Sequence, residues 1–181
     1  MGITGAVLAG GRSQRFGSDK ALAELDGRTL IDHAAAIVAP FADAVIVCGR
    51  RRAPSGLIAV DDLPRAHLGP LGGLCAALAY AARRGHDFVL STGCDTPVID
   101  RGLLVRLLAG GTSTYVAEAP IIGLWSTALA GTLLHHLETC DDRSIRRWAD
   151  AAGISVAAAG QDIPNLNRPL DLAMLRRTFD D

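Results

Sequence analysis

Three cationic side chains lie in a glycine-rich stretch near the start of this 181-residue chain. The stretch reads V-L-A-G-G-R-S-Q-R-F-G-S-D-K-A-L over residues 7–22, so that Arg12, Arg15 and Lys20 follow an apolar run. Adjacent glycines let main-chain N–H groups approach an anion, and arginine and lysine neutralise its charge. The spacing differs from the P-loop and from the G-x-G-x-x-G fingerprint. We therefore predict a phosphate-binding loop of another kind; a plain surface loop with solvated arginines is the alternative.

Carboxylates follow two of the expected strands further along the chain. Asp95 stands in the motif C-D-T-P, and Asp61 and Asp62 follow an apolar run. A carboxylate at a strand end can hold Mg²⁺ between phosphate oxygens. Taken alone, Asp95 would more simply begin a turn or cap a helix, and Asp61 and Asp62 would form a solvated turn. The segment 69–73 (G-P-L-G-G) leads into an expected helix, and its glycines would also let a flat base lie against the backbone.

Expected strands and helices alternate through the first half of the chain. Apolar runs and turn signals predict strands over 3–8, 44–47, 57–60, 88–91, 114–117, 121–125 and 154–158. Helical spacing predicts helices over 30–38, 74–84, 101–108, 128–138 and 144–152, with a last helix near Pro169. The alternation predicts an α/β fold with a mostly parallel sheet covered on both faces. Ligands bind at the carboxyl ends of such strands, so Gly10, Asp62 and Asp95 should converge on one crevice.

The composition argues against nucleic-acid and membrane partners. The formal net charge is −1 and aromatic residues make up only 4% of the chain. Binding to a duplex normally requires a basic footprint, and base stacking requires exposed rings. No apolar run is long enough to span a bilayer, and the four cysteines form no C-x-x-C pair. We expect a single domain over residues 1–181, in the cytoplasm and with reduced cysteines.

Six segments carry a resemblance that covers nearly the whole chain. They are L-A-G-G-x-S-x-R-x-G-x-D-K-A-L at 8–22, L-I-D-H at 30–33, G-P-L-G-G at 69–73, C-D-T-P at 94–97, P-x-x-G-L-W at 120–125 and N-x-N-x-P-x-D at 165–171. In order and spacing, the chain resembles the molybdenum cofactor guanylyltransferases of the MobA type. The resemblance implies a three-layer Rossmann-like nucleotidyltransferase fold. It also implies a reaction of GTP with molybdenum-bound molybdopterin that gives the guanine dinucleotide cofactor and pyrophosphate.

For the nucleotide, the resemblance implies a binding site built from several parts of the chain. Its residues are Leu8, Ala9, Gly10, Gly11, Lys20, Asp62 and Gly69. The main chain of the first four would cradle the nucleotide. Asp62, which corresponds to the family's aspartate before G-P-L, would help to hold nucleotide or metal.

The resemblance assigns catalytic roles to Arg15, Lys20 and Asp95. Arg15 and Lys20 would bind the β and γ phosphates, and Asp95 would bind a Mg²⁺ ion that bridges the α phosphate. The acceptor phosphate is already an anion near neutral pH, so transfer would rest on positioning and charge neutralisation. Asn165 and Asn167 would lie near the pterin acceptor. Other molybdenum cofactor biosynthesis proteins or molybdoenzymes would be partners.

Other functions stay open at this point. The chain has Cys48, Gly49 and Arg50 where relatives often carry an asparagine that helps to read the base. One alternative is therefore a cytidylyltransferase for the same pterin, or a guanylyltransferase for another small phosphorylated acceptor. A second alternative is a nucleotide-binding module without turnover, although Lys20, Asp95 and the glycines give no sign of an inactive site.

Overall fold

The apolar run near the start of the chain forms a central strand of the sheet. In the computed structural model, which describes residues 1–10, 19–166, 170, 171 and 174, all six residues of β1 (Ile3–Leu8) are buried. β1 pairs in parallel with β4 (Ala44–Cys48) on one side and with β6 (Phe88–Gly93) on the other. The strand order therefore reverses at β1, and ligands of open α/β sheets bind above the carboxyl end at such a point.

The sheet has seven strands in the order β5-β4-β1-β6-β8-β7-β9. The other four are β5 (Ile58–Val60), β7 (Thr114–Val116), β8 (Gly123–Ser126) and β9 (Ser155–Ala157). β5 extends the parallel set, β8 is antiparallel to β6 and β7, and β9 is parallel to β7. The prediction of a mostly parallel sheet is confirmed. A separate hairpin joins β2 (Glu24–Leu25) to β3 (Arg28–Thr29).

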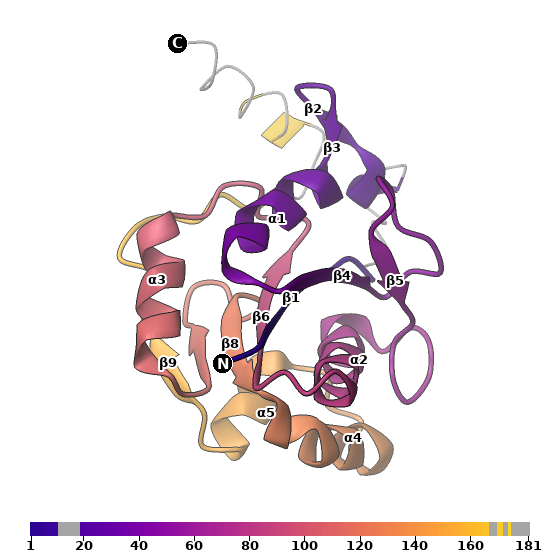
Figure 1. Cartoon of the computed structure of the whole chain (residues 1–181), viewed down its shortest axis with the longest axis vertical. Coiled ribbons are helices and arrows are strands. Elements are labelled where there is room, and N and C mark those ends of the chain that lie inside the picture. Colours follow the sequence, from indigo (N-terminus) through magenta and orange to yellow (C-terminus); the bar gives the residue numbers. More distant parts are fainter. Residues whose placement is uncertain (11–18, 167–169, 172–173, 175–181) are drawn as a thin grey trace.

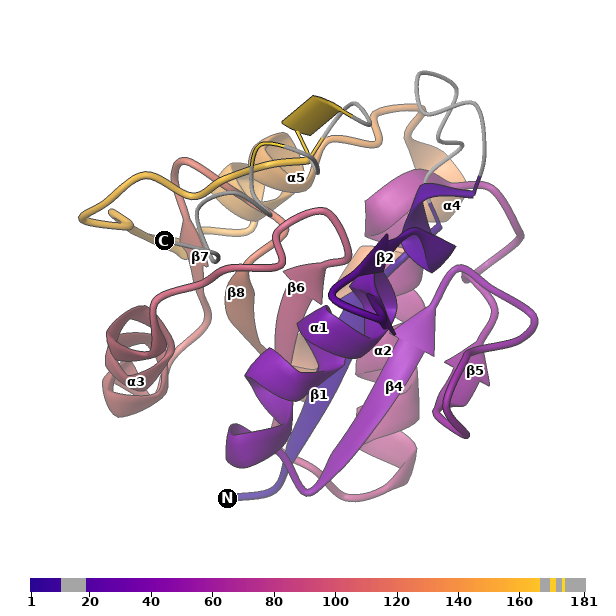
Figure 2. The ribbon, with the colours of Figure 1, turned by 90° about the horizontal axis from the view of Figure 1, so that it is seen from above.

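Helices cover both faces of the sheet, as Figures 1 and 2 show. α1 (Leu30–Val38) and α3 (Arg101–Gly110) lie on one face. α2 (Gly69–Arg83), α4 (Ala130–Thr139) and α5 (Ile145–Ala151) pack on the other, around the buried Trp125 and Trp148. Three short 3₁₀ turns complete the described elements: η1 (Lys20–Leu22), η2 (Ala39–Phe41) and η3 (Thr127–Leu129). The three-layer Rossmann-like arrangement agrees with the resemblance.

Local signals explain where α1 begins. The hydroxyl of Thr29 accepts a hydrogen bond from the main-chain N–H of Asp32 at 3.1 Å. The Asp32 carboxylate accepts in return from the N–H of Thr29 at 3.3 Å. This reciprocal capping box satisfies two donors at the helix start, and the predicted bounds of 30–38 are confirmed.

The prediction for the start of α2 was wrong. Residues 69–73 belong to the helix itself, which begins at Gly69 and not near residue 74. Pro70 suits a first turn. A Cβ on Gly72 would lie 2.7 Å from the Leu68 side chain, and one on Gly73 would lie 3.2 Å from the Cβ of Cys48. The glycines thus let the first turns pack directly on the sheet. The helix predicted near Pro169 begins outside the described residues.

The described part of the chain contains neither a membrane-spanning helix nor a disulfide. None of its helices has the length and apolar character needed to cross a membrane. All four cysteines are free thiols.

Candidate active site

Lys20 and Asp95 meet beyond the carboxyl ends of β1 and β6. The Lys20 Nζ atom lies 3.5 Å from Asp95 Oδ2, although the residues are 75 positions apart. The Lys20 side chain is 10% exposed and the Asp95 side chain 29%. A largely buried ammonium group requires a partner of opposite charge. Asp95 provides that charge, so the structure brings together two of the residues predicted for catalysis.

The C-D-T-P turn sets the direction of the Asp95 carboxylate. The N–H and the hydroxyl of Thr96 both donate to the carbonyl oxygen of Gly93, at 3.4 and 3.1 Å. Thr92 and Thr96 are fully buried, with their hydroxyl oxygens 3.3 Å apart. A Cβ on Gly93 would overlap Asp95 Oδ1. Glycine at this position therefore lets the carboxylate fold back over the strand end.

The C-terminal segment contacts this turn directly. The main-chain N–H of Leu166 donates to the carbonyl oxygen of Asp95 at 2.9 Å. The Leu166 side chain is 2% exposed and packs with Leu25 and Leu30. Asn165, which precedes it, is exposed. One residue predicted near the acceptor is thus held beside the turn that carries the predicted metal ligand.

Asp62 is buried at the edge of the sheet, just beyond β5. The residue is 7% exposed, and its Oδ1 atom has no hydrogen-bond partner within the described part of the chain. Burial raises the pKa of the Asp62 carboxyl, and the main-chain N–H groups of Leu68 and His67 offset part of this effect. An acceptor without a donor in such a place is unusual. It fits the prediction that Asp62 helps to hold nucleotide or metal, which stays a prediction.

Four glycines let the backbone approach Asp62 closely. A Cβ on Gly49 would lie 2.5 Å from Gly10 Cα and 3.1 Å from Asp62 Oδ1. Added Cβ atoms on Gly10, Gly72 and Gly73 would lie 3.2 to 3.6 Å from atoms of the same carboxylate side chain. The ends of β1 and β4 and the start of α2 therefore meet at Asp62. Gly49 has a φ of +81°. It was not predicted as a site residue, although its position directly after a strand could have indicated one.

The other residues predicted to bind nucleotide border the same edge. Leu8 and Ala9 are each 4% exposed, so their side chains serve the core and only their main chain can line a ligand site. Gly69 opens α2 with φ of +69°. The remaining predicted residues lie outside the described part of the chain: Gly11, Arg12, Arg15 and Asn167.

A second ion pair flanks Lys20. Arg50 Nη1 donates to Asp19 Oδ1 at 2.9 Å, and Arg50 Nη2 donates to the other carboxylate oxygen. Their hydrogen bond holds the pKa of Asp19 below its ordinary value and raises the pKa of Arg50. In the sequence, Arg50 stands out only as a departure from relatives. The pair leaves no local sequence pattern, because the contact joins residues 31 positions apart.

These residues fit a magnesium ion that arrives with a nucleotide. Mg²⁺ in such sites is usually held by one or two carboxylates together with substrate phosphates and waters. Within the described ranges, no group of three or more His, Cys, Asp or Glu side chains could hold a metal by itself. Asp95 offers one partly exposed carboxylate in a fixed direction. This donor set suits an ion shared with phosphate oxygens.

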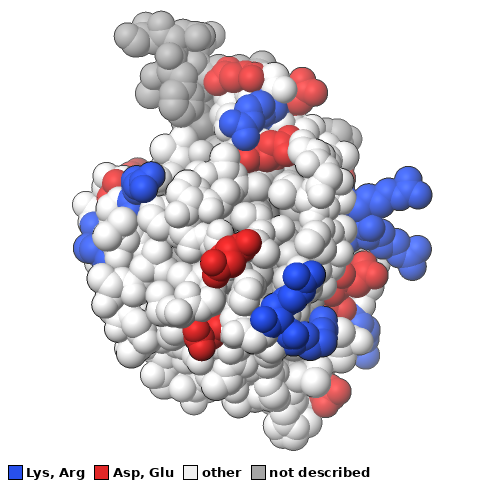
Figure 3. All heavy atoms as spheres, viewed as in Figure 1, with Lys and Arg blue, Asp and Glu red and all other residues white. Residues whose placement is uncertain are grey.

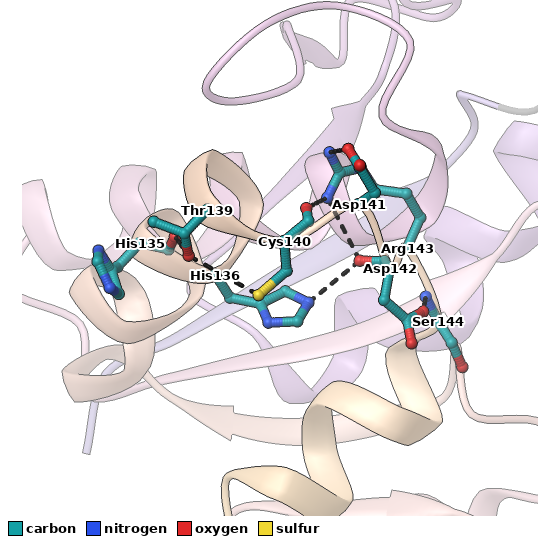
Figure 4. A network of polar contacts seen from close by, with 8 residues as sticks. All are labelled: His135, His136, Thr139, Cys140, Asp141, Asp142, Arg143 and Ser144. Atoms are coloured by element: carbon teal, nitrogen blue, oxygen red, sulfur yellow. Dashed lines mark hydrogen bonds and ion pairs between the residues drawn. The ribbon is translucent and has the colours of Figure 1, made fainter.

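The two adjacent histidines of α4, His135 and His136, do not share a site. In Figure 4, His135 and His136 point in different directions. His136 Nε2 lies 3.1 Å from the carbonyl oxygen of Asp142, and Arg143 donates to the carbonyl oxygen of Cys140. The first contact joins α4 to the connection that leads to α5, and the second lies within that connection. Figure 2 places that connection on the side toward which β1 and β4 run.

Charged side chains are dispersed over the face drawn in Figure 3. Basic residues occupy several separate places, with acidic side chains and uncharged surface between them. A protein that binds a duplex normally presents a basic patch or stripe.

Similarities to known proteins agree with this geometry. Residues 5–158 match the MobA-like NTP transferase domain. The molybdenum cofactor guanylyltransferase of Rhodobacter capsulatus is 33% identical over 181 residues, which cover 96% of this chain and 94% of that protein. Molybdopterin-guanine dinucleotide biosynthesis protein A from Archaeoglobus fulgidus has the same fold, with a TM-score of 0.74 at 19% identity over 98% of both chains.

A cytidylyltransferase has the same fold. The 2-C-methyl-D-erythritol 4-phosphate cytidylyltransferase from Thermus thermophilus superposes with a TM-score of 0.69 at 18% identity, covering 97% of this chain and 98% of that one. The choice between GTP and CTP therefore depends on the site and not on the fold.

Proposed function

We propose that this chain, which belongs to the MobA-like NTP transferase family, transfers GMP from GTP to molybdenum-bound molybdopterin. The products would be the guanine dinucleotide cofactor and pyrophosphate. The contact between Lys20 and Asp95 carries the proposal. It places one cation and one carboxylate at the sheet edge where ligands of this fold class bind, and a nucleoside triphosphate with Mg²⁺ requires both groups.

Lys20 would stabilise the leaving pyrophosphate. Without nucleotide, Lys20 and Asp95 compensate each other's charge in a site that is only partly open to water. An incoming triphosphate offers Lys20 a stronger anionic partner, which leaves the Asp95 carboxylate available. Lys20 is then placed to neutralise the charge that grows on the leaving group as the bond to the α phosphorus breaks.

The new bond forms between a phosphate oxygen of the acceptor and the α phosphorus of GTP. This oxygen is ionised near neutral pH, so the reaction does not require a strong general base. Asn165 lies next to the C-D-T-P turn through the Leu166–Asp95 hydrogen bond and would help to orient the acceptor. The chain thus contributes mainly through position and charge.

Asp95 is the proposed magnesium ligand, with Asp62 as a second carboxylate at the same edge of the sheet. The ion, when bound, would supply positive charge to the phosphate oxygens around the reacting phosphorus. The Gly93 carbonyl and the two buried threonines keep the Asp95 turn in one conformation.

The proposal also covers the substrates, the partners and the cellular location of the protein. GTP and a molybdopterin-type acceptor are its substrates, and the product would pass to a molybdoenzyme or to another molybdenum cofactor biosynthesis protein. Four free cysteines suit the reducing cytoplasm.

A calorimetric titration with GTP, CTP and ATP in the presence of Mg²⁺ tests the nucleotide half of the proposal. We expect a clear preference for GTP. Preference for CTP would instead indicate a cytidylyltransferase with the same site. Binding of GTP without release of pyrophosphate, with any acceptor, would indicate a nucleotide-binding module. A protein that binds none of the three nucleotides would contradict the assignment of the site.

A further inference from the structure

Arg50 and Asp19 form a two-pronged contact beside Lys20. Both terminal nitrogens of Arg50 donate to the Asp19 carboxylate, one to each oxygen. The Arg50 side chain is 18% exposed and the Asp19 side chain 44%, so the arginine lies mostly out of water. A planar guanidinium that binds both carboxylate oxygens fixes distance and angle together. Arg50, just beyond the end of β4, therefore fixes the position of Asp19.

Asp19 begins the turn that carries Lys20. Its Oδ1 atom accepts from the N–H of Ala21 at 3.3 Å, and its carbonyl oxygen accepts from the N–H of Leu22 at 3.0 Å. Asp19 is thus the N-cap of η1, whose first residue is Lys20. Ala21 is 3% exposed, so the turn rests on the core. A shift of the Asp19 carboxylate would shift the backbone from which the Lys20 side chain extends.

The charges of both ion pairs act on one small region. Asp19 and Lys20 are consecutive residues, and Lys20 contacts Asp95 at 3.5 Å, so the two ion pairs meet at the start of η1. Arg50 also brings a positive charge to the site, so a test must separate its charge from its positioning effect.

We propose that Arg50 is a positioning residue for nucleotidyl transfer: by holding Asp19, it sets where the Lys20 ammonium lies relative to the nucleotide phosphates and Asp95. This inference rests on the proposed function, because it takes Lys20 to be the phosphate ligand. A lysine at position 50 would keep the charge but could not form two parallel hydrogen bonds to one carboxylate.

The first test does not depend on activity. Lys20 is the only lysine in the chain, so protein grown with ¹³C,¹⁵N-lysine gives NMR signals from this one residue. We expect Arg50→Ala and Asp19→Asn to move the Lys20 signals in the same direction. Arg51→Ala, which changes the exposed neighbouring arginine, should leave them in place. Unmoved Lys20 signals in folded Arg50→Ala protein would overturn the proposal.

The second test measures Mg²⁺–GTP binding by calorimetry. We expect Arg50→Ala and Arg50→Lys each to weaken GTP binding about tenfold, because a displaced ammonium loses its contact with phosphate. Adding Arg50→Ala to Lys20→Ala should cause no further loss, since Arg50 acts through Lys20. Wild-type affinity in Arg50→Lys, or full additivity in the double variant, would overturn the proposal.

The two tests separate this inference from the proposed function. If the wild-type protein binds no nucleotide, the proposed function fails, and the lysine signals still show whether Arg50 positions Lys20. If the wild type binds GTP and the Lys20 signals do not respond to Arg50→Ala, only the positioning role fails.

Discussion

The main-chain N–H of Leu166 donates to the carbonyl oxygen of Asp95 at 2.9 Å. Through this hydrogen bond, the segment that carries Asn165 is joined to the turn that carries the proposed magnesium ligand. The Leu166 side chain also packs with Leu25 and Leu30, so the same residue contacts the hairpin before α1. The nucleotide and acceptor sides of the proposed site therefore meet at one turn.

Replacing Leu166 with alanine should affect the acceptor more than the nucleotide. The loss of this buried side chain should lower the free energy of unfolding by about 2–3 kcal/mol. The segment that carries Asn165 would lose its side-chain packing on Leu25 and Leu30, whereas the Lys20–Asp95 contact would remain. Urea unfolding and separate KM values for GTP and acceptor test this. Leu170→Ala, at a residue 66% exposed, is the control and should change stability by less than about 0.5 kcal/mol. Equal rises in both KM values would contradict the expectation.

Asp95→Asn should reduce the rate of transfer by about 10³-fold, because it removes the charge on which the proposed magnesium site depends. The main-chain bond from Leu166 does not involve this charge, so circular dichroism should show an intact fold. Asp26→Asn is the matched control: it makes the same charge change at the exposed hairpin tip, where φ of +50° suits asparagine. Substantial turnover in Asp95→Asn would refute the metal role.

Gly93→Ala should lower both the rate of transfer and the stability. The added Cβ would displace Asp95 Oδ1 and would approach Ile121 Cδ1 to 3.0 Å. We expect about 10²-fold slower transfer and a loss of about 1–3 kcal/mol in the free energy of unfolding. Gly131→Ala provides the comparison, because its Cβ would meet no heavy atom within 4 Å and should stabilise α4 by about 0.5–1 kcal/mol. A Gly93→Ala protein of normal activity would show that the carboxylate direction is unimportant.

Much of the site could be predicted from the sequence, because its residues come directly after strands of the parallel part of the sheet. Asp95 lies beyond the end of a recognisable apolar strand, and Lys20 ends the glycine-rich stretch that follows another. Their meeting at 3.5 Å agrees with the rule that carboxyl ends of parallel strands share one edge. The bounds of α1 were predictable because Thr29 and Asp32 form a local capping box.

Other features depend on contacts between distant segments and leave no local pattern. Gly49 matters because its backbone touches Gly10 and Asp62, and Arg50 matters because it binds Asp19. The start of α2 was misplaced because glycines ordinarily disfavour a helix interior. Here Gly72 and Gly73 are required by close packing against Leu68, Asp62 and the sheet.

Asp62→Asn should make stability less dependent on pH. Burial raises the pKa of Asp62 above its ordinary value of 3.8, so the native state holds this proton more tightly than the unfolded state does. The resulting stabilisation is complete below pH 3.8 and is lost as pH rises through the native pKa. Relative to wild type, the variant should therefore gain stability as the pH rises above 3.8, measured by urea unfolding at each pH.

The same variant should bind GTP more weakly, because the carboxylate charge is gone. Asp61→Asn removes the same charge from the exposed neighbouring residue and is the control for a general charge effect on GTP binding. A stability difference between Asp62→Asn and wild type that does not change with pH would contradict the role assigned to the buried carboxylate.

The most direct test is a transfer assay with purified protein, Mg²⁺, molybdenum-bound molybdopterin and one nucleoside triphosphate at a time. Dinucleotide product is followed by mass spectrometry and pyrophosphate by a coupled assay. We predict one pyrophosphate per guanine dinucleotide formed, rates with CTP and ATP at least about 100-fold lower, and no product with Lys20→Ala. Equal use of CTP, or product formation that survives the loss of Lys20, would contradict the account.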